Sequence, residues 1–150
     1  MITTTAKAAA LFLRLALGAA YLSSVASRFQ IWPESLGGGN WEKFTAYTAS
    51  LNPWAPAAII PLIVWIVTVA ETVLGVTLVL GIRQRETGIL SGVLLILFAF
   101  GMTLGEGPKS PFDYSVYTAS AASFLLAALG ESLWAVDNFL RKGIQPTAAK

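Results

Sequence analysis

Two charged side chains lie inside apolar stretches, where a charge is costly. Arg14 lies within residues 8–22 and Glu71 within residues 63–80. An ionisable group at membrane depth is rare, and it marks either a function or a buried partner. At 1.5 Å per residue, both groups would lie roughly 9 to 15 Å from the same side of the membrane. Because a guanidinium and a carboxylate can form two parallel hydrogen bonds, we predict that Arg14 contacts Glu71.

Two interpretations of this predicted pair stay open. As a structural element, it would fix the register of two membrane helices. As a functional element, it would be the polar end of a site for a quinone or a small acid, with hydroxyl groups from Tyr21, Thr68 and Thr72. In both cases the loss of one partner should cost more than the loss of both, because the remaining charge would be buried alone.

Composition indicates a membrane protein. Of the 150 residues, 55% are hydrophobic and 12% are charged, about half the charge of a soluble domain. A spanning helix needs about 20 mostly apolar residues, so we expect one all-α polytopic domain over residues 1–150. It should be a bundle of four transmembrane helices, at about residues 8–29, 57–80, 88–104 and 114–133. A cleaved signal peptide in place of the first span is disfavoured by Arg14 within its apolar region.

The basic residues predict the orientation, since cytoplasmic loops carry an excess of Lys and Arg. One side of the membrane would hold Lys7, Arg83, Arg85, Arg141, Lys142 and Lys150. The other side would hold Arg28, Lys43 and Lys109 among four acidic residues. We therefore expect a bacterial inner-membrane protein with both termini in the cytoplasm and Arg83 as a polar residue of the inner turn.

The first outer loop should contain a short helix in the membrane surface. Asn40 can cap its start, and Trp41, Phe44 and Leu51 then share one face at helical spacing. Aromatic side chains favour the headgroup level of a membrane, and Trp32 and Trp54 would extend this belt. The belt is either an interfacial anchor or an aromatic mouth for a lipid or a quinone.

The residue types that are missing narrow the chemistry. The chain has no Cys and no His, so it lacks the usual ligands of iron–sulfur clusters, bis-His haem, zinc and copper. We expect no cofactor bound covalently or through metal ligands, and quinone or lipid as the candidate non-covalent ligands. The basic residues are scattered, which does not suggest nucleic acid as a partner.

The chain resembles the DoxX family of small four-span bacterial membrane proteins. The matching residues are Arg14-Leu-Ala-Leu-Gly18, Glu71 followed by Leu74-Gly75, Gly81 and Arg83. The resemblance implies a four-helix inner-membrane protein that is often associated with redox systems. One branch resembles the membrane subunit of a thiosulfate:quinone oxidoreductase. Only Arg14, Glu71 and Arg83 carry over as polar positions of the family type.

Two functions from different classes are therefore expected. The first is an accessory subunit that packs on a larger respiratory or photosynthetic electron-transfer complex, has no redox centre of its own and is not catalytic alone. Its partners would be lipids and other membrane subunits. The alternative is a quinone-interacting subunit of a thiosulfate:quinone oxidoreductase-like enzyme. A small transporter is disfavoured because no inverted repeat and no helix broken at the midplane is apparent.

Overall fold

The computed structural model describes residues 3–138, and its secondary structure is helical. The elements are α1 (Thr4–Arg28), the 3-10 turn η1 (Glu34–Leu36), α2 (Trp41–Leu51), α3 (Ile60–Leu80), α4 (Gln84–Glu106), α5 (Ser110–Asp113) and α6 (Val116–Leu129). No strand occurs within residues 3–138. The predicted all-α class is confirmed.

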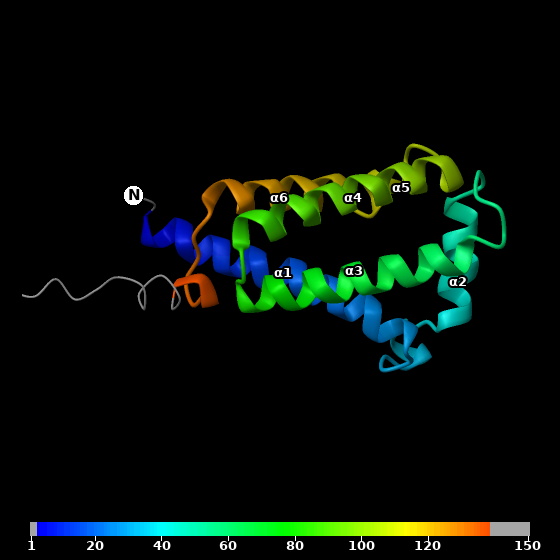
Figure 1. Cartoon of the computed structure of the whole chain (residues 1–150), viewed down its shortest axis with the longest axis horizontal. Coiled ribbons are helices and arrows are strands. Elements are labelled where there is room, and N and C mark those ends of the chain that lie inside the picture. Colours follow the sequence, from blue (N-terminus) through cyan, green and yellow to red (C-terminus); the bar gives the residue numbers. More distant parts are fainter. Residues whose placement is uncertain (1–2, 139–150) are drawn as a thin grey trace, which may run out of the picture.

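Four of the helices run along the long axis of the molecule as two antiparallel pairs. α1 packs along α3, α4 packs along α6, and α1 also contacts α6. The short helix α2 lies across the end of the bundle where α3 begins, as Figure 1 shows. The core between the pairs is built mainly from Leu17, Tyr21, Leu74, Leu78 and Leu126.

Three helices are long and apolar enough to cross a membrane: α1, α3 and α4, with 25, 21 and 23 residues. They coincide with the first three predicted spans. The predicted fourth span, residues 114–133, is not one long helix. α6 has 14 residues because Ser115 adopts a left-handed conformation before it and Gly130 does so after it. At 1.5 Å per residue it extends about 21 Å, short of the roughly 30 Å hydrocarbon core.

Local sequence explains where the helices begin and end. The side chain of Asn40 accepts a hydrogen bond from the Lys43 N–H at 2.8 Å, which confirms the predicted cap of α2. Thr3 caps α1 in the same way, by accepting from the Ala6 N–H. Gly81 ends α3 with a positive φ of 70°, a conformation that glycine adopts without a steric penalty.

Glycines set the distance between the paired helices. A Cβ on Gly18 would lie 3.0 Å from the Gly75 carbonyl oxygen, and a Cβ on Gly88 would lie 2.8 Å from that of Ser123. Small residues allow such close contact between helix backbones in lipid. The contact of Gly18 with Gly75 also fixes the register of α1 against α3, which decides which polar residues meet.

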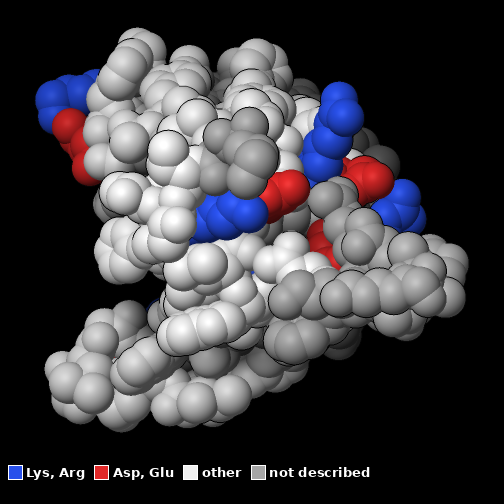
Figure 2. Space-filling view, turned by 90° about the vertical axis from the view of Figure 1, so that its left-hand side faces the viewer, with Lys and Arg blue, Asp and Glu red and all other residues white. Residues whose placement is uncertain are grey.

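Charged residues gather at the end of the bundle where α1 begins and α3 ends. Figure 2 looks at this end and shows basic and acidic side chains next to one another. Lys7 pairs with Glu131 at 2.8 Å and Arg83 with Glu86 at 3.3 Å. Because these pairs are exposed, each contributes little to stability, and they mark this end as one that faces water.

Candidate functional site

A buried ion pair joins α1 to α3. The Arg28 guanidinium, at the last residue of α1, contacts the Glu71 carboxylate near the middle of α3. Each residue is only 4% exposed. Arg28 also donates to the Thr68 hydroxyl at 2.8 Å and to the Ser24 hydroxyl at 3.2 Å. The guanidinium is therefore held by one carboxylate and two hydroxyl oxygens, which offset much of the cost of its burial, while its Nε has no hydrogen-bond partner among the described residues.

The helix α2 covers this ion pair from the end of the bundle where α3 begins. The ring of Phe44 lies over the Arg28 guanidinium, with 3.5 Å between the guanidinium carbon and the ring centroid. This geometry is a cation–π contact, which gains strength where water is excluded. Thr68 lies eight residues after Ile60, so the pair lies about 12 Å beyond the start of α3. The pair is sealed inside the protein.

The predicted contact between Arg14 and Glu71 is wrong, because Arg28 takes that place. Arg14 lies 14 residues earlier on α1, about 21 Å away along the helix axis. The prediction treated both helices as entering the membrane at the same level. The register set by Gly18 and Gly75 instead places Arg14 beside Gly81, at the end of α3.

Arg14 occupies a second buried site of its own. It is 2% exposed, and its Nη2 donates to the Trp134 carbonyl oxygen at 3.3 Å. Within residues 3–138, its Nε and Nη1 have no hydrogen-bond partner. The Asp137 carboxylate supplies an attractive charge, and the C-terminal end of a helix favours a cation. Arg14 therefore joins α1 and α3 to the segment that follows α6.

The three predicted hydroxyl groups are not gathered at one site. Thr68 binds Arg28, as described above, whereas the Thr72 hydroxyl donates to the Thr68 carbonyl oxygen at 2.7 Å. The Tyr21 hydroxyl lies 3.0 Å from the Ser91 hydroxyl, which in turn lies 2.9 Å from that of Ser123. This chain of hydroxyl groups joins α1, α4 and α6 through the core.

Arg83 lies in the turn between α3 and α4 and helps to form this turn through its backbone. It adopts a positive φ of 46° just before α4. The Asp137 carboxylate accepts from the Arg83 N–H at 2.9 Å and from the Gln84 N–H at 3.0 Å. Asp137 thereby caps α4 from a distant part of the sequence, which no local pattern could indicate.

The predicted aromatic belt divides into packed and exposed members. Trp41 packs against Phe29 and Trp65, with ring centroids 5.7 and 4.6 Å apart. Trp32 and Trp54 are 45% and 64% exposed, so they are available to a membrane surface. Burial is also the main reason that the pKa of Tyr47, on α2, rises to about 12.

Arg28 is the buried partner of Glu71 that the sequence interpretation missed. It was counted as a cation of the outer loop, because it follows the apolar stretch rather than interrupting it. Two signals could have found it. Ser24 precedes it by four residues and so lies on the same helix face, and the pairing of Gly18 with Gly75 places residue 28 close to residue 68.

Comparisons with known proteins identify the family. The family model described as methylamine utilisation protein MauE matches residues 6–107, which include both buried arginines and Glu71. No curated protein and no solved structure matches the chain. The expected membership of the DoxX family is wrong, because the matching family is a different one, and the short apolar motifs behind that resemblance are not specific to it. The thiosulfate:quinone activity that rested on the resemblance loses its basis. The chain belongs to the MauE family of methylamine utilisation proteins.

Proposed function

We propose that this protein is a membrane-embedded accessory subunit that acts in methylamine utilisation together with an electron-transfer enzyme. The family description supports the pathway. Oxidation of an amine carbon releases electrons that a redox centre must accept. Because these 150 residues contain no Cys and no His, we assign that centre to a partner protein.

The observation that carries the accessory role is the sealed ion pair. Arg28 and Glu71 are the strongest candidates for chemistry in α1 and α3, yet both are almost fully buried. Their contacts come from the same chain: Thr68, Ser24 and the Phe44 ring. A pair enclosed in this way positions helices, and it offers no open face to a substrate.

We further propose that α6 is a fourth crossing, that α2 lies in the outer membrane surface and that both termini are cytoplasmic, in a bacterial inner membrane. Because Arg28 lies in the core and not in the outer loop, the difference in Lys and Arg content between the two ends of the bundle is larger than the sequence alone suggested. Lys43 and Lys109 then remain as the cations of the outer end, against Lys7, Arg83 and Arg85 at the other end. The positive-inside tendency therefore favours the end with Lys7, Arg83 and Arg85 as the cytoplasmic one.

The orientation predicts a labelling pattern in intact cells. The chain has no cysteine, so any maleimide label on the purified protein must be attached to the single introduced cysteine. Lys43→Cys should react with a membrane-impermeant maleimide added outside, and Arg85→Cys should react only after the membrane is permeabilised. The opposite pattern would overturn the proposed topology.

The accessory role predicts that growth depends on the protein but not on the ion pair itself. Deleting the gene should abolish growth on methylamine as the sole nitrogen source, and the wild-type gene should restore it. The double variant Arg28→Leu/Glu71→Leu, expressed at a matched membrane level, should also restore growth. Affinity purification in mild detergent should recover the same stoichiometric partner with both proteins.

Three outcomes would contradict this role. A deletion strain that grows normally on methylamine would remove the protein from that pathway. A folded double variant that keeps its partner but does not support growth would show that the pair takes part in chemistry. Amine-dependent reduction of a quinone by the isolated chain would show that the chain is catalytic without a partner.

A further inference from the structure

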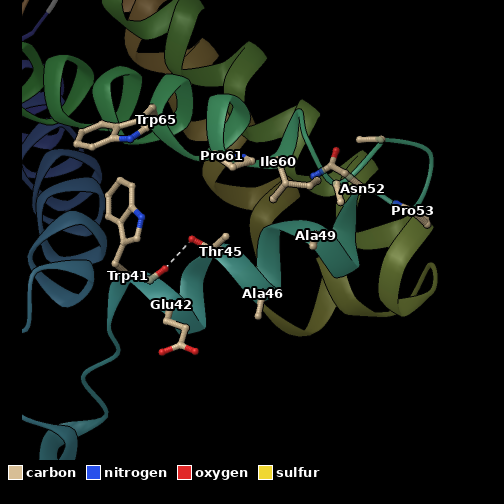
Figure 3. Close-up of a pocket in the computed structure, with 12 residues that line it drawn as sticks. Trp41, Glu42, Thr45, Ala46, Ala49, Asn52, Pro53, Ile60, Pro61 and Trp65 are labelled. Carbon is tan, nitrogen blue, oxygen red and sulfur yellow. Dashed lines mark hydrogen bonds between the residues drawn. The ribbon is translucent and has the colours of Figure 1, made fainter.

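A groove opens between α2 and the start of α3. Its volume is about 690 Å³, which lies within the range of ligand sites. Figure 3 shows Ala46 and Ala49 on the α2 side, and Ile60 and Pro61 on the facing side. Both alanines are exposed, so their small side chains leave the groove open along its length. The groove has the shape and lining that suit an apolar chain.

One end of this groove is aromatic and its rim is acidic. Trp41 and Trp65 close the end, with 4.6 Å between ring centroids, and Trp65 is 54% exposed. Glu42, next to Trp41 on α2, is the only ionisable residue in the lining. In Figure 3 its carboxylate points away from the tryptophan rings, toward the outside of the groove.

The carboxylate at the rim lies in the first turn of α2, where the helix dipole favours a negative charge, but no basic side chain of the described residues pairs with it. Within residues 3–138, no ion pair includes Glu42. Its neighbour Lys43 is engaged by Glu34, with 2.6 Å between Nζ and Oε1, and this contact lowers the pKa of the Glu34 carboxyl. No cation lines the groove to hold an anionic headgroup. The negative charge of Glu42 at the rim therefore suits a ligand with a positively charged headgroup.

We propose that the groove binds a phospholipid with an amine headgroup, one acyl chain lying along Ala46 and Ala49 and the ammonium group next to Glu42. One wall of the groove is the start of α3, a helix that is long and apolar enough to cross a membrane, so lipid is a natural neighbour of the groove. Tryptophan favours the headgroup level, so the aromatic end of the groove, where Glu42 lies, is the end that suits the headgroup. This site is separate from the Arg28–Glu71 pair, and it goes beyond the proposed function.

Native mass spectrometry of the full-length protein tests the proposal. The protein is released from vesicles that contain equal amounts of phosphatidylethanolamine and phosphatidylglycerol. The wild type should retain one phosphatidylethanolamine per chain. Ala49→Trp fills the groove and should reduce the retained lipid by about tenfold, the equivalent of losing several buried methylene contacts. Glu42→Gln should keep one lipid but lower the preference for phosphatidylethanolamine by about two- to fivefold, as expected for an exposed ion pair.

Two matched variants serve as controls. Val73→Trp introduces the same side chain at an exposed position on α3, outside the groove lining, and should leave lipid retention unchanged. Glu34→Gln removes an exposed outer acid that does not line the groove, and should leave the headgroup preference unchanged. Equal retention by Ala49→Trp and wild type, or equal retention of the two lipids by the wild type, would overturn the proposal. A dimer without lipid would overturn it in favour of a second copy of the chain.

Discussion

Glu71→Leu is expected to cause the largest loss of stability of any single side-chain change in α3. The leucine leaves the Arg28 guanidinium buried and without its carboxylate, and breaking a buried ion pair in this way costs about 3–5 kcal/mol. Arg28→Leu should have a similar effect, because it leaves the Glu71 carboxylate unpaired. The measurement is the free energy of unfolding in mixed micelles, followed by tryptophan fluorescence.

The double variant distinguishes the energy of the ion pair from the separate effects of losing each side chain. Arg28→Leu/Glu71→Leu leaves no uncompensated charge, so it should recover a large part of either single loss. Arg14→Leu combined with Glu71→Leu serves as the control. Arg14 contacts Trp134 and Gly81 rather than Glu71, so these two losses should add. Strictly additive losses for Arg28 and Glu71 would show that the contact carries no coupling energy.

The long helices could be predicted from the sequence because their signal is local. Long apolar runs, interrupted by Arg14 in α1 and by Glu71 in α3, give α1, α3 and α4 directly, and Asn40 with the following aromatic residues gives α2. The limits of α6 were harder to predict from the sequence, because they depend on Ser115 and Gly130 in left-handed conformations. Serine rarely adopts that conformation, so an uninterrupted apolar run did not reveal the break.

The partner of Glu71 could not be predicted in the same way, because it depends on how two helices are shifted along each other. Each residue of shift moves a side chain by 1.5 Å, so a shift of a few residues changes which arginine Glu71 can reach. The close contact of Gly18 with Gly75 places Glu71 opposite residue 22, which is six positions from Arg28 and eight from Arg14. A buried charge in α3 was therefore predictable, whereas its partner was a property of the packed pair.

The surroundings of Arg14 could not be predicted from the sequence for a different reason. Its surroundings come from Gly81 and from the segment after α6, including the Trp134 carbonyl oxygen and the Asp137 carboxylate. These residues are more than 60 positions away from Arg14 in the sequence. Only the folded bundle brings the segment after α6 to the point where α3 ends and α4 begins.

Gly81→Ala is expected to destabilise the bundle more than its backbone conformation alone explains. At a φ of 70°, an alanine costs about 1–2 kcal/mol. Here the new Cβ would also overlap with the Arg14 guanidinium and lie 2.7 Å from the Cβ of Ala135. Overpacking of a tight site adds about 1–3 kcal/mol, so the total loss should reach about 3 kcal/mol in the same unfolding measurement.

Gly130→Ala is the matched control, because Gly130 has a φ of 65° and the nearest atom to its Cβ position is 4.0 Å away. It should show the conformational cost alone, about 1–2 kcal/mol. Arg14→Met removes the buried guanidinium, so Gly81→Ala should cost less in that background than in the wild type. An equal cost in both backgrounds, or equal losses for the two glycines, would show that the turn alone requires Gly81. A smaller cost of Gly81→Ala in the Arg14→Met background would instead mean that the glycine is required for the packing of Arg14. A side chain at position 81 would occupy the space in which the guanidinium reaches the end of α3.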